Sequence, residues 1–235
     1  MKSIRVLVGV MGLSLLGLAL ACHKEEAAPG AVPTDAAAGQ VAPTEGLAPQ
    51  EPQPKATRRF LAVEGAVTVD GAPAAVGNAI GETSTIETAA DGSAVITLEP
   101  GSVVKLRPST KVTLGTSERK KLSVKLALGA IWSFLTPGSS YEVVSPNAVA
   151  GVRGTVFYME AEAAGATYVC ACEGKVEMQT PDGKGFKKVV NSPKKNHKGF
   201  RFAQKGKKIK AKPAKRANHT DDEAATIMAH VEESK

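Results

Sequence analysis

The sequence predicts an all-β fold of many short strands, arranged as a short twisted solenoid or roll, with a β-sandwich as the alternative. Over residues 122–128, Leu and Val alternate with Ser, Lys and Ala, a period of two that gives a strand one buried and one exposed face. Turn signals also recur at the spacing of about 8 to 12 residues that is typical of small β domains. They are Asp70-Gly71, Asp91-Gly92, Pro100-Gly101, Pro108, Gly115, Gly129, Pro137-Gly138 and Gly174.

The clearest strand pattern lies within residues 141–178. Apolar alternation continues to Pro146, which lacks an N–H group and therefore ends or edges a strand. Gly151 and Gly154 follow, and they allow backbone angles or close approaches that a Cβ atom would block. After two further alternating runs, Glu173-Gly174 predicts a hairpin turn.

Two segments of this stretch resemble the core motif of the FecR domain, a family of bacterial periplasmic all-β domains. They are Ser-Pro-Asn-Ala-Val-Ala-Gly-Val-Arg-Gly-Thr-Val-Phe at 145–157 and Thr-Tyr-Val-Cys-Ala-Cys-Glu-Gly-Lys-Val-Glu at 167–177. Upstream, residues 65–71 resemble the opening hairpin of the family and residues 128–132 its leucine-glycine strand. We expect the domain to span residues 59–203. The resemblance implies structural roles for Pro146, Gly151, Arg153, Gly154, Thr155 and Gly174.

The N-terminus has the plan of an exported protein. Residues 1–21 carry two basic residues and then an apolar run, which is typical of a signal peptide and short for a membrane span of about 20 residues. Ala19-Leu20-Ala21-Cys22 resembles a bacterial lipobox, in which Cys22 is acylated; cleavage by ordinary signal peptidase is the alternative. His23 resembles the sorting pattern for the outer membrane, so we expect a lipid-anchored protein facing the periplasm.

A linker is expected over residues 22–58. The stretch contains six prolines, many alanines and almost no large apolar residue, so it cannot bury enough surface to offset the entropy of ordering the chain. We interpret it as a disordered tether between membrane and domain, with a dispensable low-complexity segment as the alternative.

The excess of basic residues that gives the net charge of +7 is confined to one segment of the chain. Fourteen Lys and Arg lie between Gly183 and Arg216 without an acidic residue, which leaves 30 − 14 = 16 basic residues against 23 acidic ones elsewhere. We therefore expect a basic tail at residues 204–219 that is too polar to fold alone. It either is merely solvated or binds lipopolysaccharide phosphates, anionic lipid headgroups or acidic glycans; export makes nucleic acid a poorer partner. The candidate polyanion-binding residues are Lys205, Lys207, Lys208, Lys210, Lys212, Lys215 and Arg216.

The sequence predicts neither catalysis nor a metal or other cofactor. Its four histidines lie at positions 23, 197, 219 and 230, outside residues 60–180, the part of the expected domain that resembles the FecR family and that we take as the folded β core, so the usual general base and commonest metal ligand are absent from that core. Arg153 is the one charged residue within residues 145–157, which we call the signature run. We favour a structural role in which it donates to buried loop carbonyls; contact with a partner's carboxylate and simple exposure are the alternatives.

Cys170 and Cys172 are two residues apart in a predicted strand, so their side chains share a face. A disulfide between them would be strained, since Cα atoms two apart in a strand lie about 6.6 Å from each other. Free buried thiols and an intermolecular or metal link remain open.

The chain is expected to end in a short helix over residues 220–235. Thr220 and Glu223 have the spacing of a capping box, and an apolar stripe runs through Ile227 and Val231. A helix this short is marginal in isolation, so we expect it to dock on the β domain, with another protein as the alternative. Taken together, the sequence predicts a non-catalytic envelope lipoprotein used for binding or scaffolding. The alternative is a periplasmic component of sigma/anti-sigma signalling that acts through a separate membrane partner.

Overall fold

The computed structural model describes residues 58–117, 121–194 and 196–235. The predicted signal peptide (1–21), Cys22 and the predicted linker up to residue 57 lie outside the described residues. The described part contains β1 (Arg59–Glu64), β2 (Val67–Val69), β3 (Ala72–Pro73), β4 (Thr85–Thr88), β5 (Ser93–Glu99), β6 (Ser102–Leu106), β7 (Lys111–Thr116), β8 (Leu122–Phe134), β9 (Ser140–Val144), β10 (Val149–Arg153), β11 (Val156–Ala161), β12 (Ala166–Gln179), β13 (Lys187–Ser192), β14 (Lys198–Lys205), β15 (Lys208–Ala214) and α1 (Asp221–Glu233).

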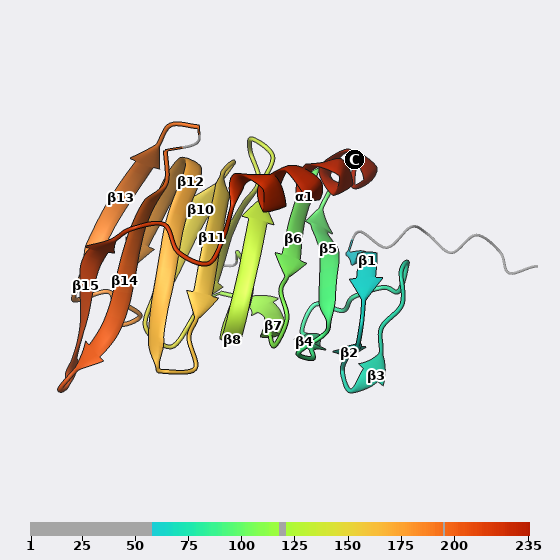
Figure 1. Cartoon of the computed structure of the whole chain (residues 1–235), viewed down its shortest axis with the longest axis horizontal. Helices are drawn as coiled ribbons and strands as arrows, with labels where there is room; N and C mark the ends of the chain where they lie inside the picture. Colours follow the sequence, from blue (N-terminus) through green and yellow to red (C-terminus); the bar gives the residue numbers. More distant parts are fainter. Residues whose placement is uncertain (1–57, 118–120, 195) are drawn as a thin grey trace, which may run out of the picture. The chain divides into compact units, whose positions relative to one another are not determined.

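These strands form two sheets that share β8 and β12. The front sheet has the order β1–β5–β6–β8–β11–β12–β14–β15, and α1 lies across it (Figure 1). The back sheet has the order β3–β2–β4–β7–β8–β9–β10–β12–β13. Pairing among the described strands is antiparallel except between β8 and β9. The predicted all-β class with a short C-terminal helix is confirmed, and the sheet rolls over itself through the shared strands.

The two shared strands bend at glycines. The first half of β8 pairs with β7 and the second with β11, and the change falls at Gly129. In β12 the change of partner falls at Gly174. Both glycines have a positive φ, of 83° and 88° respectively, which a residue with a Cβ atom rarely adopts. The predicted turns at these positions are therefore wrong: each glycine bends a continuous strand into the other sheet, as glycines do at the corners of rolled sheets.

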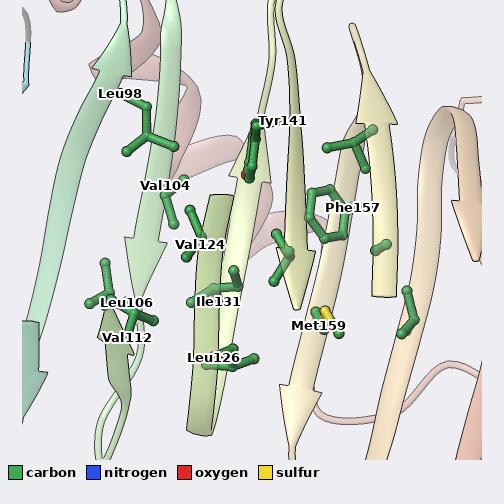
Figure 2. Packing of buried hydrophobic residues seen from close by; sticks show 14 of the residues in the cluster. Leu98, Val104, Leu106, Val112, Val124, Leu126, Ile131, Tyr141, Phe157 and Met159 are labelled. Carbon is green, nitrogen blue, oxygen red and sulfur yellow. The ribbon is translucent and has the colours of Figure 1, made fainter. Parts of the chain in front are cut away.

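The main core fills the space between the two sheets (Figure 2). Val124 and Leu126 of β8 face Phe157 and Met159 of β11 across this space, and all four are buried. The sequence predicted that this buried face continues to Leu128, but Leu128 is 41 % exposed. A register shift between β7 and β8 at Lys111 accounts for that difference, since an extra residue in a ladder turns the next side chains away from their expected face.

Helix α1 covers a second apolar cluster on the outer face of the front sheet. Ile227 and Val231 are buried there with Trp132 and Tyr158, as the predicted docking on the β domain requires. The Thr220 hydroxyl accepts a hydrogen bond from the Glu223 backbone N–H at 3.2 Å, which confirms the predicted N-cap. Because α1 shields this face, the central front strands are buried on both sides.

The predicted basic tail is wrong for residues 208–214. These residues form β15, which pairs with β14 along its whole length and ends the front sheet. The segment is too polar to fold alone, but its period of two places Ile209 and Ala211 against the main core while the lysines face outward. A strand at a sheet edge needs only one apolar face, and lysines are common on its other face.

Candidate functional site

The outer face of the front sheet brings two cysteines and two histidines together beside α1. Cys170 and Cys172 are neighbours on one face of β12, as predicted; His197 precedes β14 and His219 precedes α1. One sulfur or ring nitrogen from each residue lies within 4.8 Å of the corresponding atoms of the other three. We call these four residues the Cys/His cluster. Both cysteines are free and buried, so the candidate disulfide between them is not formed.

Both histidines of the cluster also have a hydrogen-bond partner outside it. The Nε2 atom of His197 lies 2.7 Å from Oδ1 of Asp221, the first residue of α1. The Nδ1 atom of His219 lies 2.6 Å from the carbonyl oxygen of Ala217. The hydrogen bond from His197 is the main reason that the pKa of Asp221 is lowered. Within the cluster, the hydrogen bond from the Cys172 thiol lowers the pKa of Cys170.

Aromatic rings hold His219 in place. Its ring stacks on Tyr158 with centroids 4.4 Å apart and meets the edge of Trp132 at 5.0 Å. His219 is 5 % exposed, and the side chain of His197 is 7 % exposed. The cluster is therefore a buried polar group within an otherwise apolar layer, an arrangement that calls for a specific chemical reason.

Sequence reasoning missed this cluster because it placed every histidine outside the β core. His197 and His219 are indeed outside regular strands, but the connections that carry them fold back over β12. The expectation that no histidine belongs to the β core is therefore wrong for His197 and His219, whose rings lie against the two cysteines of β12. The available signal was the Cys-x-Cys pair on one strand face, but nothing in the local sequence reveals which distant residues complete it.

A cavity of about 450 Å³ lies next to the cluster, between α1 and the front sheet. Phe134 and Val156 line it from the sheet, and Ala225 and Met228 line it from the helix. Cys172 and His197 of the cluster also belong to its lining. Met228 is 47 % exposed, so the cavity reaches solvent along the helix.

Lysines cover the outer face of the sheet edge, beyond the part under α1. Lys205 of β14 pairs directly with Lys208 of β15, and Lys210 and Lys212 follow on the same face. All four are exposed, and their side chains make no ion pair or hydrogen bond with any described residue. We call these four residues the lysine face.

The other predicted polyanion-binding residues lie elsewhere. Lys207 is in the turn between β14 and β15, and Lys215 is exposed after β15. Arg216 is engaged by Asp221, with Nη1 and Oδ2 3.2 Å apart. The structure therefore gathers four of the seven predicted residues on one surface.

The signature residues have structural positions, with one exception. Pro146 lies in the turn between β9 and β10. A Cβ atom on Gly174 would lie 2.8 Å from Cγ2 of the buried Thr155, so these two positions pack directly together. Gly151 belongs to β10 and Gly154 follows it with a φ of 57°.

Arg153 does not have the structural role that we favoured. Its side chain is exposed and has no hydrogen bond or ion pair among the described residues. Strand β10 ends at this residue, where the side chain points to solvent rather than into a buried loop. The two remaining alternatives, simple exposure and contact with a partner, are both compatible with this position.

The model of the FecR protein family matches residues 84–177. These residues form a FecR domain. It runs from the residue before β4 into the second half of β12, and it contains the whole signature run and both cysteines. The opening hairpin at residues 65–71 lies outside the match, and the wider span 59–203 stays a prediction.

Two crystal structures of a candidate anti-sigma factor from Parabacteroides distasonis are similar to the chain. Their TM-scores are 0.44 and 0.43, each at 20 % identity over 55 % of this chain. The similar region covers 59 % of those chains. No curated protein matches the sequence. None of the helices in the described part of the chain is long and apolar enough to cross a membrane.

Proposed function

We propose that the chain is a non-catalytic binding module of the bacterial cell envelope, anchored by an acylated Cys22, whose lysine face contacts an anionic lipid or lipopolysaccharide surface. The observation that carries the proposal is the alignment of Lys205, Lys208, Lys210 and Lys212 on one exposed face without acidic partners. Lysines that are not neutralised within the protein are free to bind phosphate groups. The FecR domain supports the envelope location, with the outer membrane and the periplasm as the proposed compartment.

The buried state of the Cys/His cluster supports a non-catalytic role. Its thiols and imidazoles are the described side chains best suited to nucleophilic or general-base chemistry near neutral pH, but three of the four residues are buried and their ligand atoms lie within 4.8 Å of one another. A substrate would need to displace these contacts to react. A binding function makes no such demand.

Neutralising part of the lysine face tests the proposal. In the full chain carrying Cys22→Ser, which removes the predicted acylation site, we expect K210Q/K212Q to weaken binding to anionic phospholipid vesicles. Each basic residue near an anionic membrane contributes about 1 kcal/mol, so the loss should be roughly 30-fold at low salt. The unsubstituted lysine face should bind neutral vesicles poorly and lose affinity as salt increases.

The matched control is K111Q/K187Q, which changes net charge equally. Lys111 and Lys187 lie on back-sheet strands and pair with Glu87 and Glu177 at 2.7 and 2.9 Å. We expect this variant to bind vesicles almost as well as the parent chain. Equal weakening by both double substitutions would mean that overall charge, not the lysine face, governs binding.

A second candidate function is favoured by the FecR domain itself. In the best-known members of that family, the domain relays transport signals from an outer-membrane receptor to a cytoplasmic sigma factor. We propose as the alternative that this chain is a periplasmic component of such signalling and acts through a separate membrane partner. Affinity purification from envelope extracts should then recover a receptor or signalling protein. If the chain is recovered in full yield with lipid but without a partner protein, this alternative is contradicted.

A further inference from the structure

The Cys/His cluster has the dimensions of a tetrahedral metal site. Sγ of Cys170 lies 3.6 Å from Nδ1 of His197, and Sγ of Cys172 lies 3.7 Å from Nε2 of His219. The two ring nitrogens are 3.1 Å apart. A tetrahedral Zn²⁺ ion with Zn–S bonds of about 2.3 Å and Zn–N bonds of about 2.0–2.1 Å requires S···N separations of about 3.5–3.6 Å and an N···N separation of about 3.3–3.4 Å. These three of the six ligand separations agree within a few tenths of an ångström, and the other three are no longer than 4.8 Å.

The outer hydrogen bonds fix which ring nitrogens are available. His197 donates its Nε2–H to the Asp221 carboxylate, and His219 donates its Nδ1–H to the Ala217 carbonyl. In the neutral rings, the remaining nitrogens then carry lone pairs, and these are the two atoms that face each other at 3.1 Å. Two lone pairs at this distance repel unless a cation or an added proton lies between them. A carboxylate or carbonyl behind each histidine is the usual outer arrangement of zinc-binding histidines.

The apolar surroundings favour a site without net charge. Cys170 is fully buried and Cys172 is 5 % exposed, within the apolar cluster of Trp132 and Tyr158. Two thiolates balance the two charges of Zn²⁺, whereas an isolated thiolate or imidazolium would be strongly disfavoured there. A Cys₂His₂ ligand set in tetrahedral geometry selects zinc over cations that prefer oxygen ligands.

We propose that Cys170, Cys172, His197 and His219 bind one Zn²⁺ ion, with Asp221 and the Ala217 carbonyl as outer partners. On binding, the two thiols release their protons to solvent and four bonds form to the metal. The site has a structural role, because it joins β12, the connection before β14 and the N-terminus of α1. This inference is independent of the lysine face, which none of these residues contacts.

Metal titration of the full chain, reduced and freed of metal under argon, tests the site directly. We expect one tight equivalent of Co²⁺ per chain, with the intense visible absorption of a tetrahedral ion and a thiolate charge-transfer band, and displacement of Co²⁺ by Zn²⁺. Cys170→Ala should lose more than about 100-fold in Zn²⁺ affinity because it removes a ligand. Asp221→Ala should lose about 10- to 100-fold because it removes only the outer partner of His197.

The matched control is His230→Ala. His230 lies on α1 but pairs with Glu233 at 3.2 Å, outside the cluster, so this variant should bind Zn²⁺ like the unchanged chain. If a cysteine variant fails to fold, the Co²⁺ absorption spectrum of the unchanged chain still shows whether the chain binds the metal through thiolates. The proposal is overturned if the reduced chain binds no tight Co²⁺, or binds it without a thiolate band. It is likewise overturned if Cys170→Ala and His230→Ala bind Zn²⁺ equally well, since the Zn²⁺ would then be bound without Cys170.

Discussion

Truncating Ile227 should separate the docking of α1 from the stability of the β domain. Ile227 is 1 % exposed and lies in the apolar cluster with Trp132. Truncation of a buried Ile to Ala destabilises proteins by about 2–5 kcal/mol. Because α1 packs on the sheet with one face only, its neighbours can partly close the space, and we expect Ile227→Ala to lower the free energy of unfolding by about 2–3 kcal/mol. A helix of 13 residues has little stability of its own, so much of this loss should appear as undocking of the helix.

Urea denaturation followed by circular dichroism and by tryptophan fluorescence measures both effects. Trp132 is the single tryptophan of the chain, and it is fully buried in the cluster that α1 covers. In Ile227→Ala, its emission should shift to longer wavelength at a lower urea concentration than the loss of β signal. Met228→Ala is the matched control: Met228 is 47 % exposed, so its truncation should lower stability by less than about 1 kcal/mol. If the two variants lose equal stability, or if Trp132 emission does not respond to Ile227→Ala, the assignment of Ile227 as the anchor of α1 is wrong.

Three further substitutions test other parts of the fold. Gly174→Ala should lower the free energy of unfolding by about 1–3 kcal/mol in chemical denaturation. Gly165→Ala is the control and should lower it less. Both glycines have a positive φ, but only at Gly174 does the added Cβ have neighbouring atoms within 4 Å. Thr220→Ala should lower stability by about 1 kcal/mol through loss of the helix cap; an unchanged midpoint would contradict the cap. The carboxylate of Asp70 accepts the Thr85 N–H at 2.8 Å, a bond that lowers the pKa of Asp70. A carboxylate whose pKa is lowered by folding stabilises the folded state at pH values above its pKa in the unfolded chain, about 3.9. The difference in stability between the unchanged chain and Asp70→Asn should therefore disappear as the pH falls below this value. A difference in stability that does not depend on pH would contradict this role of Asp70.

Patterns within a few residues predicted the features that depend on neighbouring residues alone, namely strand faces and the start of the helix. The alternation through Val124 and Leu126 predicted buried strand faces, and Thr220 with Glu223 predicted the start of α1, because both signals act within a few residues. Each was confirmed in the structure. The same local signals could not distinguish a hairpin turn from a bend inside a strand at Gly174, since both use glycine with a positive φ.

Contacts between distant residues explain the remaining differences. His197 and Cys170 are 27 positions apart, and His219 and Cys172 are 47 positions apart. No periodicity links such pairs, so the cluster became visible only when the connections folded over β12. The segment 208–214 looked too polar to fold because its apolar face has only Ile209 and Ala211 against the core, and an edge strand obtains the rest of its stability from pairing with β14.

The boundary of the FecR domain separates the shared part of the fold from the features that carry both proposals. The family match ends at residue 177, within β12, and therefore includes Cys170 and Cys172 but neither His197 nor His219. Strands β14 and β15, the lysine face and α1 also lie beyond it. The C-terminal segment thus extends the front sheet, completes the Cys/His cluster and closes the outer apolar face. Binding of an anionic surface and binding of zinc, as proposed above, both depend on this segment, which carries the lysine face and the two histidines, and not on the signature run itself.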